Sequence, residues 1–325
     1  MPAAAGEGGT TMPASAIHTF TDADAYAAAV RHSDVELAVT ARGAFGARLT
    51  QVALHDVFMQ RFSETLPRVV HSGATVARVG ITFRTGPGAG LRWNNVELAP
   101  DSVARLSEGY EAYQRSSGVV AFGAISLPIS RMLAVAAALG VRGEARPGPH
   151  LSLRPRPAAL ARLRHLHEQA GDLASTAPEV IANPDTARGL EAALVEAMVA
   201  CLDAPEPAED TTAQRRHEKI MRRFHAAIAT HEGDALYMPD LCAAIGVPQR
   251  TLNSCCHESL GMSPKRYLLL RRMHLARQTL RNATPGRTTV TDTAARFGFW
   301  NFGRFAVEYR ALFGEKPSET LRMAG

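Results

Sequence analysis

The feature that most limits the fold of this chain is an internal repeat in its last third. Eight positions recur in a second copy further along the chain. The first three, which end at a glycine, recur 52 residues later, and the five after this glycine recur 53 residues later. The pairs are Cys242 with Ala294, Ile245 with Phe297, Gly246 with Gly298, Leu252 with Phe305, Cys256 with Tyr309, Leu260 with Phe313, Gly261 with Gly314, and Pro264 with Pro317. A fixed offset of this kind indicates one supersecondary unit that is built twice.

Each copy has the pattern of a helix-turn-helix unit. A short helix ends at Gly246 or Gly298, because glycine readily takes a left-handed backbone, and a large apolar residue anchors the helix that follows. The pattern predicts these units over about 239–258 and 290–313. Between the two units, the apolar residues have the spacing of one helix face, so a single linker helix joins them. These residues are Leu269, Met273, Ala276 and Leu280.

Charge is distributed unevenly along the chain. Residues 214–325 hold 18 Lys and Arg against 9 Asp and Glu, so the remainder is slightly acidic although the total is +5. A basic block favours a polyanionic partner, although it is also typical of a solvated surface. The second helix of each unit adds side chains suited to base edges in the major groove, where Arg suits guanine and Asn or Gln suits adenine. These polar faces comprise Gln249, Arg250, Asn253 and Ser254 in the first copy, and Asn301, Arg304, Glu308 and Arg310 in the second.

Residues from about Arg215 to Arg322 resemble the DNA-binding domain of the AraC/XylS family of transcription regulators. The resemblance rests on TDTAARFGFWNFGRFAVEYRALFGEKPSETLR and on LGMSPKRYLLLRRMHLARQTL, and GFWNFGRF and PSETL are closest to the XylS-like branch. It implies an effector-responsive homodimer that binds promoter DNA, works with RNA polymerase and activates a catabolic operon. It implies no cofactor.

Residues can be carried over from the family position by position. The resemblance implies base-facing roles for Arg250, Asn253, Ser254, Asn301 and Arg304. Candidates for phosphate contacts are Lys219, Arg222, Arg223, Lys265, Arg266, Arg271 and Arg272. Two reading helices on a rigid connector would enter successive major grooves about 34 Å apart. The first copy departs from the family, with Pro248 in place of a capping Ser, Ser254 in place of Arg and Cys256 in place of a core Phe.

The 325 residues suffice for two domains, and we predict an α+β fold. Residues 1–16 form a disordered tail, 17–202 a β-rich sensor domain with a helical dimerisation region, 203–214 a linker, and 215–325 the DNA-binding domain. Within the β-rich part we predict turns at GPGAG and WNN, and two helices: one over 22–31, capped by Thr21 or Asp22, and one over 101–115, opened by Pro100-Asp101-Ser102. Three helices follow Ser130. On the last of these helices, one apolar stripe could be either a face packed in the core or a dimer interface. It comprises Leu190, Leu194, Ala197 and Cys201.

The effector cannot be identified from these residues. Four side chains on or near predicted strands could meet a carboxylate or an aromatic ring: Arg42, His71, Arg84 and Trp93. The XylS-like branch implies an aromatic acid or a small amine. The 12 histidines have no ligand spacing, so we assign no metal site.

Two other classes of protein stay open. The family's DNA-binding domain is sometimes fused to a DNA-repair methyltransferase that uses a reactive cysteine, so Cys255 and Cys256 could indicate an enzyme, although we predict none. An effector-independent DNA-binding protein is the second alternative. The chain has no apolar run of roughly 20 residues, and its start, MPAAAGEGG, lacks a secretory pattern. We therefore predict a cytoplasmic protein with reduced thiols.

Overall fold

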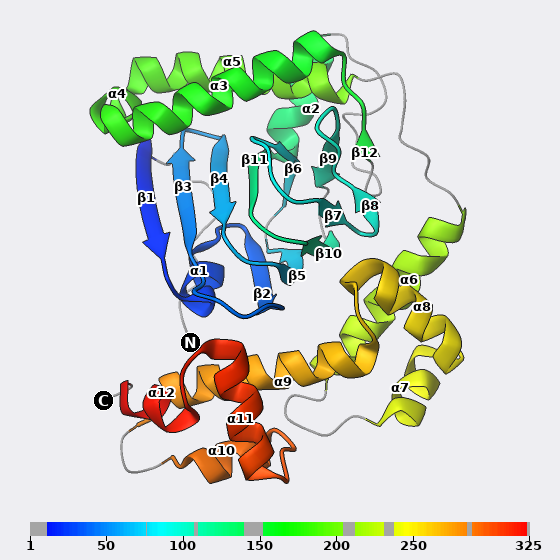
Figure 1. The fold of residues 1–325 in the computed structure, drawn as a ribbon. Helices are drawn as coiled ribbons and strands as arrows, with labels where there is room; N and C mark the ends of the chain where they lie inside the picture. The colour runs from blue at the N-terminus through cyan, green and yellow to red at the C-terminus, as the bar shows by residue number, and fades with distance from the viewer. Residues whose placement is uncertain are drawn as a thin grey trace.

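The fold is known from a computed structural model, which describes residues 12–75, 77–106, 110–139, 152–203, 212–230, 237–284 and 288–323. Two antiparallel sheets form the N-terminal part and helices form the C-terminal part, so the predicted α+β class is confirmed (Figure 1). Over these residues, no helix is both long enough and apolar enough to cross a membrane.

The two sheets face each other as the layers of a sandwich. The larger sheet has the order β1 (Ala14–Phe20), β3 (Ala47–Ala53), β4 (Phe58–Glu64), β11 (Val120–Pro128), β6 (Arg78–Arg84), β9 (Val103–Leu106) and β12 (Ser152–Leu153). The smaller has the order β2 (Ser33–Val39), β5 (Arg68–Ala74), β10 (Glu111–Ser116), β7 (Leu91–Trp93) and β8 (Val96–Glu97). Asn94 and Asn95 both have positive φ between β7 and β8, which confirms the turn predicted at WNN.

Helices cover the sandwich on the side of the larger sheet. They are α2 (Ile129–Ala138), α3 (Pro157–Thr176), α4 (Pro178–Ala182) and α5 (Pro184–Leu202). Their apolar faces share one core with this sheet, and Leu194, Ala197 and Cys201 are fully buried in it. The apolar stripe of α5 is therefore a core face and not a dimer seam. Helix α1 (Ala23–Ala29) packs in a second core, between the sheets, and Asp22 caps it as predicted.

Two predictions for the N-terminal part are wrong. Residues 101–115 contain strands β9 and β10 instead of a helix. The capping pattern at Asp101 and Ser102 was a local signal, but pairing with β6 and with β5 outweighed it because Val103, Ala112 and Tyr113 are buried there. Strand β1 begins at Ala14, inside the predicted tail, because it pairs with β3 along its whole length. Residues 1–11 lie outside the described residues.

The C-terminal part is a chain of seven helices in the described residues, and Figure 1 shows it beneath the sandwich. They are α6 (Thr212–Ala229), α7 (Met238–Ile245), α8 (Gln249–Leu260), α9 (Pro264–Arg281), α10 (Val290–Arg296), α11 (Phe302–Phe313) and α12 (Pro317–Met323). Helix α9 is the predicted linker helix; its 18 residues span about 27 Å. Most of the predicted linker, residues 204–211, lies outside the described residues.

Candidate nucleic-acid interface and ligand cavity

The repeat in the sequence is a repeat in backbone geometry. Gly246 and Gly298 end the first helix of each unit with φ of 76° and 72°. Gly261 and Gly314 end the second helix with φ of 72° and 78°. A prolyl residue then opens the next helix in both copies, as expected for a residue with no N–H to satisfy. Both units therefore have the same turn because the same residues impose it.

The second helix of each unit carries the base-facing candidates. On α8, Arg250 and Ser254 are exposed and Asn253 is half-buried. On α11, Arg304 is exposed, and its Nε donates to Oε1 of Glu308 at 2.8 Å. Asn301 lies at the N-cap of α11, where its Oδ1 accepts from the Arg304 backbone N–H at 2.9 Å. The Asn301 amide nitrogen is thus the part of this side chain left for a base.

The phosphate candidates divide into two groups. Lys219, Arg222 and Arg223 on α6 and Lys265 and Arg266 at the start of α9 are exposed. Arg271 and Arg272 instead face the protein. Arg271 is buried and its Nε bonds to Oε1 of Glu36 at 2.7 Å, whereas Arg272 lies over the ring of Phe299. In this arrangement Arg271 holds two domains together and is not available to a phosphate.

Helix α9 docks on the N-terminal part of the chain along its length. Besides the Arg271 contact, His274 Nε2 lies 3.4 Å from the carbonyl oxygen of Val39. Arg277 Nη1 lies 3.1 Å from Asp22 Oδ2, and Arg281 pairs with the same carboxylate. Glu36 and Asp22 belong to the slightly acidic part of the chain before residue 214, and these arginines belong to the basic block. Some charges of the basic block are therefore paired within the molecule instead of being left for DNA.

The smaller sheet is a wall that the two halves of the molecule share. Successive side chains of a strand point to opposite faces. On β5, Arg68 and Ser72 line a cavity between the sheets, whereas His71 stacks on His225 of α6 with ring centroids 3.2 Å apart. On β10, Gln114 lines the cavity and Tyr113 packs against the core of the first helix-turn-helix unit. One face of the smaller sheet thus lines the cavity, and its opposite face packs against the DNA-binding domain.

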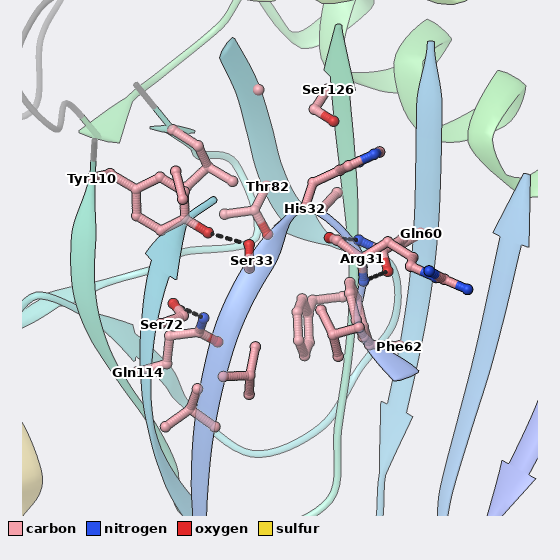
Figure 2. Close-up of a pocket in the computed structure, with 18 of the residues that line it drawn as sticks. Arg31, His32, Ser33, Gln60, Phe62, Ser72, Thr82, Tyr110, Gln114 and Ser126 are labelled. Carbon is pink, nitrogen blue, oxygen red and sulfur yellow. Dashed lines mark hydrogen bonds between the residues drawn. The ribbon is translucent and has the colours of Figure 1, made fainter. Parts of the chain in front are cut away.

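The cavity has a volume of about 80 Å³, enough for several water molecules or one small organic molecule. Apolar side chains make up much of its lining: Val35, Leu37, Phe62, Val70, Leu106 and Phe122. Phe62 and Phe122 stack with centroids 4.5 Å apart. Figure 2 shows how the polar side chains inside it satisfy one another, with Ser33 bonded to Tyr110 and Ser72 to Gln114.

A buried ion pair lies in the wall of the cavity. Glu64 accepts from the hydroxyl of Tyr26 at 2.8 Å and from Nε of Arg68 at 2.7 Å. Burial and the neighbouring carboxylate raise the pKa of Tyr26 well above its ordinary value, so the hydroxyl keeps its proton and donates. Arg68 is fully buried and also donates from Nη2 to Gln114 at 3.2 Å. Its Nη1 has no partner among the described residues.

A histidine at another part of the lining is held in an unusual backbone conformation. His32 has φ of 64°, which side-chain-bearing residues rarely adopt, and its ring packs edge-on against Phe58. Burial, with further contributions from Arg78 and Arg31, lowers its pKa to about 4. The imidazole is therefore neutral at pH 7, and its buried Nδ1 lacks a partner in the described part of the chain.

Little of this cavity could be predicted from the sequence. Of its four effector candidates, Trp93 lines the cavity, whereas Arg42, His71 and Arg84 do not. Arg68, Glu64 and His32 went unnoticed. The signal available in the sequence was the pair of opposite charges Glu64 and Arg68, four residues apart at the turn between β4 and β5. Which face of β5 points toward the cavity, however, depends on the strands that pair with it, and these lie far away in the chain.

Comparison with known proteins identifies the C-terminal third. Residues 241–323 match a family described as a helix-turn-helix domain. The chain is 40% identical over 103 residues to the probable thc operon regulatory protein of Rhodococcus erythropolis, covering 32% of this chain and 31% of that protein. It is 36% identical over 74 residues to XylDLEGF operon transcriptional activator 2 of Pseudomonas putida, covering 23% and 47%. The match thus spans about a third and about half of these curated relatives.

Among solved structures, the AraC-like transcriptional activator CuxR matches with a TM-score of 0.42 and 16% identity, over 83% of this chain and 97% of that one. The resemblance of the last third to the AraC/XylS DNA-binding domain is confirmed by the sequence matches, which include operon regulators of the XylS kind. This segment is a DNA-binding domain of that type.

Proposed function

We propose that the whole chain is a DNA-binding transcription regulator that responds to a small molecule and activates a catabolic operon. The observation that carries this proposal is the pair of helix-turn-helix units with matching left-handed glycines on one linker helix, in a segment similar to operon activators. The reading helices α8 and α11 would enter successive major grooves, with Arg250, Asn253, Ser254, Asn301 and Arg304 toward the bases.

The shared wall supports response to an effector. A molecule in the cavity would press on Arg68, Ser72 and Gln114, and strands β5 and β10 carry His71 and Tyr113 on their opposite face, against α6 and α9. A shift of these strands would alter the docking of the first unit and so its freedom to reach DNA. A homodimer, contact with RNA polymerase and a cytoplasmic location belong to this same proposal.

The buried cysteines speak against a methyltransferase. Cys255 and Cys256 both lie in the core of the first unit, and burial raises the pKa of each thiol above its ordinary value. A nucleophilic cysteine needs a lowered pKa and access to its substrate. We therefore propose a regulator that is not an enzyme. Transfer of a methyl group from alkylated DNA to either thiol would contradict this.

The test uses the full-length protein and DNA fragments selected from genomic DNA by repeated binding and amplification. Fluorescence anisotropy should detect sequence-specific binding whose affinity falls steeply as salt rises, because each neutralised phosphate releases counterions. Binding that is insensitive to salt, or a selection that enriches no sequence, would contradict the proposal.

A further inference from the structure

We propose that the second helix-turn-helix unit reads thymine methyl groups through Trp300 and Val307, two apolar side chains that the fold leaves exposed. The specificity of α11 would then rest on apolar contact, whereas α8 carries polar side chains suited to hydrogen bonds. This inference rests on the proposed function, since it names the base that one reading helix recognises in promoter DNA.

The first observation is a cluster of exposed apolar side chains. Among the described residues nine large apolar side chains are exposed, and three of them lie close together in the sequence: Trp300, Phe302 and Val307. Trp300 is 79% exposed, although tryptophan is highly buried on average in folded proteins. Single exposed apolar residues are common, but a cluster of them marks a surface that contacts another molecule.

The cluster lies on the surface of a reading helix. Val307 is three residues from Arg304 and four from Gly303, so these exposed residues share one face of α11. Trp300 directly precedes Asn301, the N-cap residue of the same helix. Figure 1 shows α11 beyond α9, on the side away from the two sheets. The cluster is therefore placed where a DNA groove can receive it.

Gly303 provides a second observation on the same face. It is exposed in the first turn of α11, where glycine weakens a helix relative to alanine. Its φ is not positive, and a Cβ added to it would meet only the Asn301 Oδ1 atom, at 3.6 Å. Nothing in the described part of the chain therefore requires glycine here. The close approach of a ligand surface would require it, because a side chain would hold the two surfaces apart.

The contrast with α8 favours thymine over another protein as the partner of this face. Helices α8 and α11 are the same element of the repeat, but the exposed residues of α8 are all polar: Gln249, Arg250, Ser254, His257 and Glu258. In the major groove, thymine is the only base that presents a methyl group, and apolar side chains contact it. Helices α10 and α11 also expose Arg296, Arg304 and Arg310, which suits a polyanion around the apolar contact.

The experiment measures the affinity of the full-length protein for the DNA site that selection from genomic DNA enriches. Each thymine of the site is replaced in turn by deoxyuridine, which still pairs with adenine but lacks the methyl group. By fluorescence anisotropy at fixed salt, we expect at least one replacement to weaken binding about fourfold, as for one methyl group removed from water. In Val307→Ala or in Trp300→Ala the same replacement should change affinity less than about twofold, because the contact is already lost.

Further variants separate the methyl contact from other effects. Val119→Ala is the matched control, since it truncates an exposed valine outside the DNA-binding domain, and should leave affinity and the deoxyuridine effect unchanged. Arg250→Ala on α8 should weaken binding but keep the deoxyuridine effect at the same thymine. Gly303→Leu favours the helix yet adds a side chain to its exposed face, and should weaken binding. Thermal unfolding of each variant checks that it is folded.

Several outcomes would overturn the assignment. One is an equal deoxyuridine effect in the wild-type protein and in both variants, and another is a selected site in which no thymine is sensitive. Unchanged DNA affinity of Trp300→Ala and Val307→Ala, with loss of self-association in sedimentation, would assign the cluster to a second copy of the chain instead. A selection that enriches no sequence would count against the proposed function itself, so the two failures are distinguishable.

Discussion

The two helix-turn-helix units share a backbone plan but differ in what holds them. The first unit packs around Leu252 and Cys256, and its core continues into Val69 and Tyr113 of the smaller sheet. The second packs around Phe305 and Tyr309, in a core formed by residues of the DNA-binding domain alone. Large aromatic side chains thus form the core of the second unit within the DNA-binding domain, whereas part of the core of the first unit is supplied by the smaller sheet.

The helix N-termini of the second unit are also better capped than those of the first. Thr289 and Asn301 both accept backbone N–H groups at the starts of α10 and α11. Tyr237 and Pro248 precede α7 and α8 and provide no side-chain cap. Under the proposed function, the first unit, with its weaker helix ends and shared core, is the one whose position an effector would change, and the second unit would keep the more constant DNA contact.

The largest expected difference concerns core truncation. Tyr309→Ala removes a fully buried ring and its contact with Thr320, and should destabilise the second unit by about 3–5 kcal/mol. At the matching position in the repeat, Cys256→Ala should cost about 1 kcal/mol in the first unit. Hydrogen exchange of α7–α8 and α10–α11 measures each loss separately. Equal losses would show that the cores are equivalent after all.

The next comparison concerns DNA affinity. Arg304→Ala should weaken specific binding about tenfold or more, because Arg304 is an exposed arginine on the better-capped reading helix. Ser254→Ala should change affinity less than about threefold, since serine reaches less far toward a base. Arg188→Ala on α5 is the control, as an exposed arginine outside the DNA-binding domain. Anisotropy at one salt concentration is the measurement, and a larger effect for Ser254 would reverse the ranking.

A third prediction tests the docking of the first unit. Glu36→Gln leaves buried Arg271 opposite a neutral amide and should weaken docking by roughly 1–2 kcal/mol, less than for a fully buried pair because Glu36 is about one-third exposed. Faster hydrogen exchange in β2 and α9 would report it. Glu315→Gln is the matched control, since Glu315 pairs with Arg277 within the DNA-binding domain. Identical exchange in both variants would argue against a docking role for Glu36.

The smallest expected effect depends on pH at the shared wall. Burial, with repulsion from His225 and Arg271, lowers the pKa of His71 from 6.5 to about 3. His225 also has a lowered pKa, through burial, despite nearby Glu36, Glu111 and Asp34. Because the unfolded chain binds the proton more readily, stability is full above pH 6.5 and falls as the pH drops toward 3.

Between pH 7.5 and 5.5 His71 alone should cost the folded protein about 1 kcal/mol. His71→Phe keeps an aromatic ring on His225 without titrating, so the dependence of the unfolding free energy on pH should become shallower by that amount. Urea denaturation at the two pH values measures it. An unchanged dependence would show that His71 does not titrate between folded and unfolded states as inferred.

The sequence predicted structure best where a residue acts through its own backbone. Gly246 and Gly298 mark helix ends that the structure places where the pattern predicted them. It was weakest in the β-rich part, where Asp101 and Ser102 suggested a helix although Val103 pairs with Phe83 in a sheet. The partner of a strand is chosen by distant residues, so a local capping pattern carries little weight there.

The sequence by itself determined the two repeated units, the linker helix and the kind of DNA-binding domain, because these depend on neighbours within one or two turns. Only the tertiary structure decided that Arg271 is buried against Glu36, a residue 235 positions away. It also decided that Arg68 faces a cavity with one nitrogen unpartnered among the described residues, since its other contact, Gln114, lies 46 positions away. Which charges remain free to bind a ligand depends on which distant groups have already paired.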